Sequence, residues 1–261
     1  MKPINPKDEK EKIIKFIRET LKKQGFKNVV IGVSGGIDST VSLYLLKETI
    51  PARNIIAIHL PYLESHEKKL KKVFNIKTIS LKPFLSEDVF FELFKEPMSR
   101  EEISSKARNK ISSEKKIRLG NITARLRMII LYDFAKKYNA LVCGTENRTE
   151  QLLGYFTRFG DAASDFEPIQ HLYKTQVYQL AKYLRLPNEF IEQKPTAGLW
   201  QGQTDEGEFG FSYEEADNVL SLYFDNKKTV EQIEKLGCKN TRKILDFGKK
   251  NSFKRETPYI L

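Results

Sequence analysis

The chain has 261 residues, 40% of them hydrophobic and 30% charged, with a formal net charge of +11. These values fit a globular protein built around one sizeable domain. No uninterrupted apolar run approaches the roughly 18 residues that cross a bilayer, and the lysine-rich N-terminus lacks the apolar stretch of a secretory signal, so we expect a cytoplasmic protein without a membrane span.

The first elements predicted along the chain are a helix, a strand and a second helix. Residues 6–24 carry isoleucine and leucine at helical spacing among lysine and glutamate, and Gly25 favours the end of that helix. Residues 28–33 (NVVIGV) form a short β-branched run that is typical of a buried strand. A turn of serine and glycine follows, and a helix is expected from Asp38 to Leu46.

After this helix the chain becomes strongly polar. The predicted elements are a strand at 54–60, a lysine-rich helix at 66–74, a strand at 76–80 and a helix at 85–94. Residues 99–118 are charged, with few apolar side chains. They are typical of a mobile surface segment, and the alternative is an active-site lid that becomes ordered when substrate binds.

The second half of the chain is predicted to be mainly helical. A helix at 121–138 precedes a fourth strand at 140–144, which is followed by a segment rich in glycine and polar residues. Further helices are predicted at 174–186, 213–224, 230–236 and 241–248.

The alternation of strands and helices predicts an α/β fold with a doubly wound, mainly parallel sheet and helices on both faces. We expect a single domain, with a core at about 26–200 and a helical C-terminal extension at about 210–261. Ligands of such sheets bind beyond the carboxyl ends of the strands. The segments after Val33, Leu60 and Gly144 are therefore expected to carry the chemistry.

The sharpest motif is Ser34-Gly35-Gly36-Ile37-Asp38-Ser39, which lies between a predicted strand and a predicted helix. Because glycine lacks a Cβ atom, the backbone there can approach an anion and present consecutive N–H groups to it. The helix start adds a dipole worth about 0.3–1 kcal/mol per anionic contact. Asp38 fits such a site if a cation bridges it to phosphate. The alternative is a plain strand-to-helix turn with a serine cap.

This motif resembles the pyrophosphate-binding loop of the N-type ATP pyrophosphatases, the PP-loop superfamily with an adenine nucleotide alpha-hydrolase-like fold. It is not a Walker A loop, which requires G-x-x-x-x-G-K-[ST]. The resemblance implies that ATP is a co-substrate and is cleaved between its α and β phosphates.

The chain resembles the NAD synthetases over essentially its whole length. The matching segments are Ala124–Met128, Gly144–Glu150 (GTENRTE), Gly154–Asp161 (GYFTRFGD), Asp165, Pro195–Trp200 (PTAGLW), Asp205-Glu206, Gly210 and Tyr213. The resemblance implies a ligase that adenylates nicotinic acid adenine dinucleotide (deamido-NAD) with ATP and then amidates it with ammonia. NAD, AMP and pyrophosphate are the products, in the last step of NAD biosynthesis.

The resemblance also implies a set of site residues. The ATP phosphates would lie on Gly32, Val33, Ser34, Gly35, Gly36, Ile37, Asp38 and Ser39, with further ATP contacts from Thr145, Lys174 and Thr196. Asp38 and Glu150 would bind Mg²⁺, and Arg125, Arg158, Asp165 and Lys254 would bind deamido-NAD. The expected catalytic groups are Asp38, Glu150, Lys174 and Asp161, the last as the candidate to bind ammonia.

Two positions depart from the family pattern. The family more often has lysine where this chain has Arg158, so a planar fork replaces a point charge. It often has His-Lys where this chain has Phe253-Lys254, which weakens a ligand contact at Phe253. Structural alternatives also stay open: solvated charges for Glu150 and Arg125, and caps or turn formers for Thr145, Thr196, Asp161 and Asp165.

Ammonia, rather than glutamine, is the expected nitrogen donor. The chain ahead of Asn28 is too short for a glutaminase domain, and glutamine hydrolysis generally needs an activated cysteine. Cys143 falls in a predicted buried strand and Cys238 near a helical turn, and neither has a histidine nearby in the sequence. A separate glutaminase subunit stays an open alternative.

The net charge of +11 allows three interpretations: a lysine-rich surface, attraction of polyanionic substrates, or binding of nucleic acid. An RNA-modifying enzyme with the same loop is the main alternative function, and a catalytically inactive nucleotide-binding module is another. The sequence shows no RNA-recognition motif, so we expect no nucleic-acid partner. The family resemblance implies a homodimer with the dinucleotide near the subunit interface.

Overall fold

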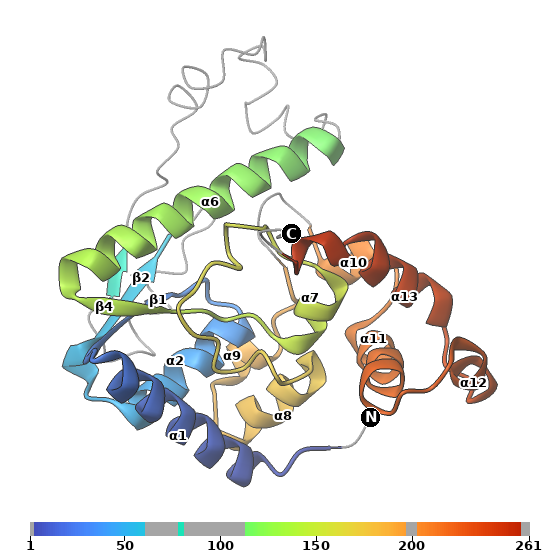
Figure 1. Cartoon of the computed structure of the whole chain (residues 1–261), viewed down its shortest axis with the longest axis horizontal. Coiled ribbons are helices and arrows are strands. Elements are labelled where there is room, and N and C mark those ends of the chain that lie inside the picture. The colour runs from blue at the N-terminus through green and yellow to red at the C-terminus, as the bar shows by residue number, and fades with distance from the viewer. Residues whose placement is uncertain (1–2, 61–77, 81–112, 197–202, 257–261) are drawn as a thin grey trace.

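The computed structural model describes residues 3–60, 78–80, 113–196 and 203–256 (Figure 1). The predicted helices at 66–74 and 85–94 and the first residues of the predicted strand at 76–80 lie outside the described residues, as do residues 99–112. None of the described helices has the length and apolar character needed to cross a bilayer.

A parallel sheet forms the centre of the described structure. Its strands are β1 (Asn28–Gly32), β2 (Ile55–His59), β3 (Thr78–Ser80) and β4 (Ala140–Cys143), in the order β3-β2-β1-β4. Val30 at the middle of β1 pairs with Ile56 of β2 and Val142 of β4. The strand order reverses at β1, so the turn after β1 and the segment after β4 flank the switch point, where such sheets bind ligands.

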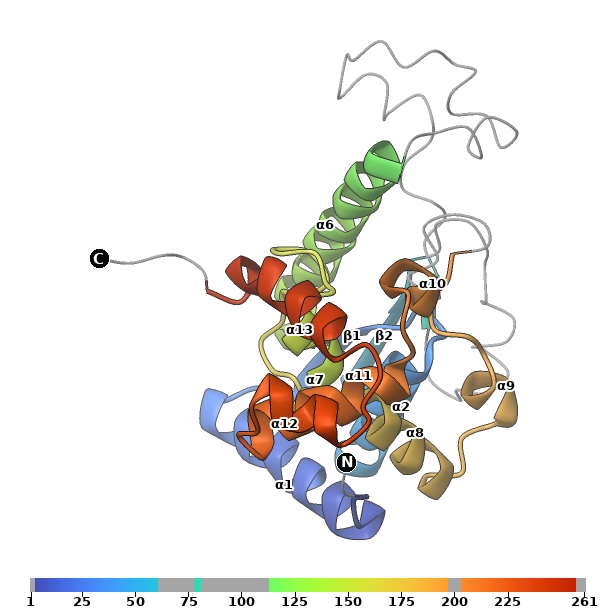
Figure 2. The same cartoon turned by 90° about the vertical axis from the view of Figure 1, so that its right-hand side faces the viewer.

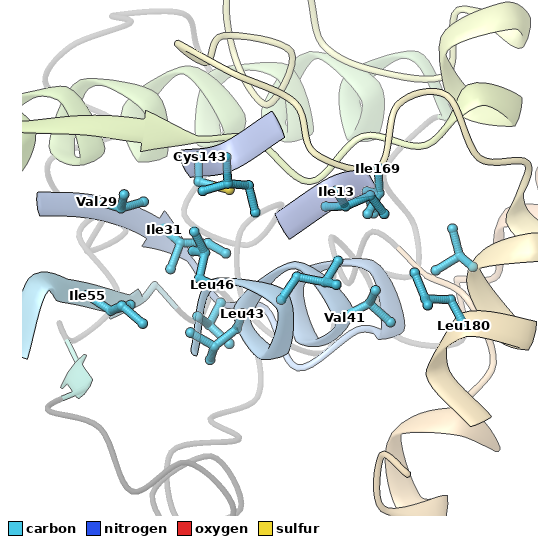
Figure 3. Close-up of a cluster of buried hydrophobic side chains, with 14 of the residues drawn as sticks. Ile13, Val29, Ile31, Val41, Leu43, Leu46, Ile55, Cys143, Ile169 and Leu180 are labelled. Atoms are coloured by element: carbon cyan, nitrogen blue, oxygen red, sulfur yellow. The ribbon is translucent and has the colours of Figure 1, made fainter. Parts of the chain in front are cut away.

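Helices cover both faces of this sheet (Figure 1). The helices α1 (Pro6–Gln24) and α2 (Ile37–Thr49) pack on one face, and α6 (Ser113–Tyr138) packs on the other. The apolar side chains that join the sheet to α1 and α2 are shown in Figure 3; they include Ile13, Ile31, Leu43 and Leu46. The prediction of a doubly wound α/β fold is therefore confirmed.

Local sequence explains why α1 has the bounds that were predicted. The side chain of Asn5 accepts a hydrogen bond from the backbone N–H of Lys7, and Pro6 occupies the first turn, where its missing N–H has no cost. Ile13, Ile17 and Leu21 then form the buried stripe. Gly25 ends the helix.

The C-terminal part is a group of shorter helices. They are α7 (Arg148–Leu153), α8 (Lys174–Tyr183), α9 (Asn188–Ile191), α10 (Asp205–Phe209), α11 (Tyr213–Leu220), α12 (Val230–Lys235) and α13 (Thr241–Lys250). The short helical turns η3 (Ser221–Asp225) and η4 (Ser252–Lys254) also belong to this part, whereas η1 (Ala52–Asn54) connects α2 to β2. Helices α11, α12 and α13 lie at the right of Figure 1, away from the sheet, and face the viewer in Figure 2. Their own buried cluster includes Leu153, Phe209 and Ile244.

Some predicted bounds were wrong. Residues 113–118 belong to α6, which therefore begins before the predicted helix start at Asn121. Lysine, glutamate and arginine favour helix without any apolar stripe, which is why periodicity missed this turn and a half. The helix predicted at 174–186 ends at Tyr183, and the one predicted at 213–224 changes to a wider π turn after Leu220. The short helices α7, α9 and α10 were not predicted.

Candidate active site

Hydrogen bonds of its own serine side chains fix the turn after β1. Gly35 has φ +91°, a conformation that disfavours any residue with a side chain. The backbone N–H of Gly36 donates to Ser34 Oγ at 3.1 Å, and Ser34 Oγ lies 3.1 Å from Ser39 Oγ. Gly36 is the N-cap of α2, and no side chain caps it. The unpaired donors of this helix start therefore remain available for an anion.

Two residues predicted to hold ATP, Gly32 and Val33, lie where β1 ends and the turn begins. Gly32 is the last residue of β1, and the N–H of Val33 donates to the carbonyl of Ile58 at 2.8 Å. The side chain of Val33 is buried. These two residues fix where the turn begins.

Three charged side chains meet beside this turn. Asp38 lies in the first turn of α2, Glu150 in the first turn of α7, and Lys174 is the first residue of α8. Lys174 Nζ lies 2.6 Å from Asp38 Oδ2 and 3.0 Å from Glu150 Oε1. The lysine side chain is 3% exposed and each carboxylate side chain 16%, so the cluster opens to solvent on its acidic side.

The electrostatics of this cluster follow from burial and from opposite charge. Burial opposes the charge of Lys174, but the Asp38 and Glu150 carboxylates outweigh it and raise the lysine pKa above its ordinary value. Burial raises the pKa of Glu150 to about 7, and Asp38 adds to this effect while Lys174 opposes it. The lysine is therefore a permanent cation, whereas Glu150 gains most from a further positive charge.

Asn147 holds Asp38 and Glu150 in this arrangement. Its side-chain amide donates to Asp38 Oδ1 at 3.0 Å, and its side-chain oxygen accepts from the N–H of Glu150 at 3.0 Å. Asn147 is fully buried and is the N-cap of α7, with a capping box to Glu150. No role was predicted for it, although N-x-x-E after a strand is a known sign of a helix start.

A buried carboxylate on α11 joins the two helices that carry Glu150 and Lys174. Asp217 is 1% exposed; it accepts a hydrogen bond from the hydroxyl of Thr149 at 2.5 Å and from the N–H of Thr175 at 2.8 Å. Thr149 in turn accepts from the N–H of Lys174 at 2.9 Å. Asp217 was not predicted, and no local pattern singles it out.

A second support comes from Tyr213 and Asp205, which belong to segments that resemble the NAD synthetases. The Tyr213 hydroxyl donates to Asp205 Oδ2 at 2.8 Å, and Lys174 Nζ lies 4.9 Å from the centre of the Tyr213 ring. Both side chains are buried. The ring thus covers the face of the ammonium that the carboxylates leave open.

The residues fit a divalent cation of the magnesium type. The Asp38 and Glu150 carboxylates converge on one ammonium, so two acidic groups surround a single positive charge here. Mg²⁺ in proteins is often bound by one or two carboxylates, with phosphate and water as its other ligands. No group of three or more histidine, cysteine or acidic side chains suited to a metal occurs in the described ranges, so phosphate would have to complete the coordination.

Two of the residues predicted to bind deamido-NAD lie close to each other. Lys254 Nζ donates to the carbonyls of Gly154 and Phe156 at 2.8 and 3.0 Å. The Arg158 guanidinium lies 5.6 Å from the ring centre of Phe253. The loop after α7 and the C-terminal tail therefore bring Arg158 and Lys254 to the same region. Phe253, the departure from the family pattern, supports Arg158 by cation–π contact.

Asp161, Arg125 and Asp165 have different surroundings. Asp161 Oδ1 accepts from the N–H of Thr157 at 2.8 Å. Arg125 is exposed on α6, one turn after Asn121, whose side chain accepts from the Thr157 hydroxyl at 2.8 Å. Asp165 Oδ2 accepts from the N–H of Val142 at 2.7 Å, so it also braces β4.

Thr145 and Thr196, the two threonines predicted to contact ATP, lie in connecting segments. Thr145 is half-buried between β4 and α7. Thr196 is exposed and follows Pro195, whose carbonyl accepts from the N–H of Asp205 at 3.1 Å. The structure therefore brings Asp38, Glu150 and Lys174 into contact, and it leaves both threonines at the edge of the site.

Comparison with known proteins identifies the family of the chain. The sequence model of the NAD synthase family matches residues 9–258. The NH(3)-dependent NAD(+) synthetase of Fusobacterium nucleatum subsp. nucleatum is 40% identical over 98% of this chain and 96% of its own length. That of Thermoplasma acidophilum is 42% identical over 96% of both chains.

Solved structures give the same picture. An NH3-dependent NAD synthetase from Campylobacter jejuni, in complex with nitrate, superimposes with a TM-score of 0.76 at 30% identity and 99% coverage of both chains. An NMN synthetase from Francisella tularensis superimposes with a TM-score of 0.75 at 32% identity and the same coverage. Because the family model matches nearly the whole sequence, the chain belongs to the NAD synthase family.

Proposed function

We propose that this chain is an ammonia-dependent NAD synthetase, a ligase that forms the amide of NAD from deamido-NAD. The observation that carries the proposal is the contact of Lys174 with Asp38 and Glu150 beside the glycine turn. Membership of the NAD synthase family and the names of relatives about 40% identical over nearly the full length support it.

The glycine turn and the start of α2 are suited to the phosphates of ATP. Ser34 and Ser39 hold the turn through their hydroxyls, and the helix start offers unpaired N–H donors. Lys174 adds a fixed positive charge at the same end of the sheet. A carboxylate that approaches a triphosphate meets a repulsion of roughly 4 kcal/mol at about 4 Å and an effective dielectric near 20. Buried positive charge at this place lowers that repulsion.

Asp38 and Glu150 are the residues that would hold Mg²⁺ in this site. When bound, Mg²⁺ neutralises phosphate charge and stabilises the departing pyrophosphate. Asn147 fixes both carboxylates through its amide group, so the protein presents them without rearrangement. Thr145 and Thr196 are proposed to contact ATP from the edges of the site.

The reaction needs no nucleophile from the protein. A carboxylate oxygen of deamido-NAD attacks the α-phosphorus of ATP, and the bond to pyrophosphate breaks. Ammonia then attacks the acyl carbon of the adenylate, the bond to AMP breaks, and the nitrogen loses one proton. Arg125, Arg158, Asp165 and Lys254 are the proposed contacts of the dinucleotide, and the protein acts by position and charge.

The cysteines support ammonia as the nitrogen donor. Cys143 is 2% exposed, and burial raises the pKa of its thiol well above the ordinary value, so it does not supply the thiolate that glutamine hydrolysis requires. Cys238 accepts a hydrogen bond from the side chain of Asn218 at 3.4 Å. Neither cysteine is placed as an activated nucleophile.

The decisive experiment supplies the protein with ATP, magnesium, ammonium and deamido-NAD, and follows NAD and AMP by chromatography. We expect the two products in equal amounts. The deamidated form of NMN is tested in parallel, because a similar solved structure is called an NMN synthetase. Asp38→Asn is expected to abolish both products, whereas Asp246→Asn, an exposed aspartate on α13, is expected to match the parent protein. Normal NAD formation by Asp38→Asn would refute the proposed role of the turn.

We also propose a homodimer, as the family resemblance implies. Ile117 and Ile129 on α6 are 55% and 57% exposed, which leaves apolar surface for a second copy to cover. Sedimentation velocity measures the mass in solution, and a single species with the mass of one chain would contradict this part of the proposal.

A further inference from the structure

A buried carboxyl group next to the proposed ATP site takes no part in the proposed reaction. Glu146 lies between Thr145 and Asn147, in the segment after β4, and is only 7% exposed. Its Oε2 accepts a hydrogen bond from the side chain of Gln170 at 3.3 Å. Its Oε1 is buried and has no hydrogen-bond partner in the described part of the chain.

A buried carboxyl oxygen without a hydrogen-bond donor is unusual. A buried acceptor that is left without a donor costs roughly 1–3 kcal/mol. Native structures contain few of them, and unobserved waters, ions and ligands are common reasons. The carboxyl of Glu146 therefore indicates a missing donor at this place.

The surroundings of Glu146 define the charge that the donor should carry. Glu167 is the nearest acidic neighbour: the N–H of Glu146 donates to Glu167 Oε2 at 3.0 Å. Asp161 and Glu150 also repel charge on Glu146. Lys254 is attracted by Asp161 and Glu146, but its ammonium is already bonded to two backbone carbonyls. The acidic groups around Glu146 therefore favour a cation as the missing donor.

Glu167 is built into the fold and cannot turn away from this cluster. Its Oε1 accepts from the Ser164 hydroxyl at 2.7 Å, in addition to the contact with the N–H of Glu146. Its carboxylate lies directly against Gly144, where an added Cβ would stand 1.8 Å from Oε1. The glycine thus leaves room for the acidic group, which is locked beside Glu146.

We propose that Glu146 binds the ammonium ion from which the amide nitrogen comes, with Glu167 and Asp161 adding negative potential around it. The bound ion transfers one proton to the Glu146 carboxylate and then attacks the adenylate as ammonia. Ammonium offers four N–H donors and one positive charge, so it matches an orphan acceptor in an acidic environment. Neutral water matches only the hydrogen bond. This inference rests on the proposed function, since ammonia is the nitrogen donor there, and it extends the site beyond Asp161, the residue that the sequence suggested.

The electrostatics agree with a cation at this point. Burial, together with Glu167, Asp161 and Glu150, raises the pKa of Glu146 to about 9. The carboxyl therefore holds a proton while nothing else neutralises it. A bound cation favours the ionised form and takes the place of that proton.

The test measures the KM for ammonium at fixed pH and fixed ionic strength, with sodium chloride as the balancing salt. For Glu146→Gln we expect an increase of at least tenfold, equivalent to about 1.4 kcal/mol, with the KM values for ATP and deamido-NAD changed less than twofold. Glu234→Gln, which removes one exposed acidic charge from α12, is the matched control and should behave as the parent. An unchanged KM for ammonium, or an equal loss for all substrates, overturns the proposal.

A second measurement needs no turnover. Ammonium chloride should raise the Tm of the parent protein above that in the same concentration of sodium chloride, and Glu146→Gln should lose this difference. Equal melting in the two salts overturns the proposal. If ammonium stabilises the parent but no NAD forms, the proposed function fails and the cation site stands. Should Glu146→Gln not fold, Asp161→Asn is used, and it must also raise the KM for ammonium.

Discussion

Replacing Lys174 with methionine tests whether the charged cluster has the arrangement described. Methionine keeps the length and apolar stem of lysine but removes the ammonium. Asp38 and Glu150 then face each other without the cation that lies 2.6 and 3.0 Å from them. The variant should be less stable, and a divalent cation should restore part of the loss.

The magnitude follows from burial. Removing one partner of a buried ion pair costs about 3–5 kcal/mol, because the charge left behind is uncompensated. Each carboxylate side chain here is 16% exposed and can draw in water, so we expect the lower end, about 3 kcal/mol. For a chain of this size, 1 kcal/mol corresponds to roughly 2–4 °C in Tm, so the expected decrease is roughly 6–12 °C.

Thermal and urea unfolding are measured for both proteins with and without magnesium chloride. Magnesium should raise the Tm of Lys174→Met more than that of the parent, because in the parent the ammonium already neutralises part of the charge of the two carboxylates. Lys182→Met, on the exposed face of the same helix, controls for the loss of a lysine. A decrease below 1 kcal/mol, or equal magnesium effects in the two proteins, would show that Lys174 does not neutralise this pair.

Three further changes test the groups around the cluster. Gly144→Ala places a Cβ against the Glu167 carboxylate and should lower the free energy of unfolding in urea by about 1–3 kcal/mol. Adding Glu167→Ala should recover most of this stability, and no recovery would contradict the described contact between Gly144 and Glu167. Asp217→Asn should lower the free energy of unfolding by about 1–3 kcal/mol, because its hydrogen bonds to Thr149 and Thr175 position α7 and α8. Magnesium binding measured by calorimetry should weaken as well, and unchanged binding would show that Asp217 contributes to stability alone. The pKa of Glu146 is raised to about 9, so the folded state binds the extra proton and loses stability as pH rises from about 5 to 9. Glu146→Gln should reduce the slope of stability against pH by up to about 1.4 kcal/mol per pH unit. Parallel curves of stability against pH for the two proteins would show that Glu146 does not bind this proton.

The part of the structure that sequence could predict is the part specified by local patterns. The apolar run before Ser34, the glycines of the turn and the spacing in residues 6–24 depend on near neighbours, and the corresponding strand, turn and helix are confirmed. General rules of α/β folds reduce the possible strand orders to a few, but they do not select the observed order β3-β2-β1-β4. The six-residue helix α7 is too short for periodicity, and only the N-x-x-E signature of Asn147 and Glu150 marks it.

The site depends on contacts that no local pattern contains. Lys174 meets Asp38 across 136 positions of sequence, and Thr149 meets Asp217 across 68. Family resemblance suggested that Asp38 and Glu150 share a magnesium ion and that Lys174 contacts ATP, but it did not indicate that Lys174 pairs directly with both carboxylates. Asn147 and Asp217 act through these residues, and their importance becomes visible only when the helices are placed.

The C-terminal helices therefore support the site directly and are more than an extension of the α/β core. A buried ammonium between two carboxylates is favourable only while all three groups keep their positions, since small separations decide whether attraction exceeds desolvation. The sheet fixes Asp38 alone, through β1 and α2. Glu150 and Lys174 begin two separate helices, and Asp217 on α11 binds both of these helix starts through Thr149 and Thr175. The charge that faces the phosphates thus depends on a residue of the helical C-terminal part, so loosening α11 should weaken the cluster even though the glycine turn stays intact.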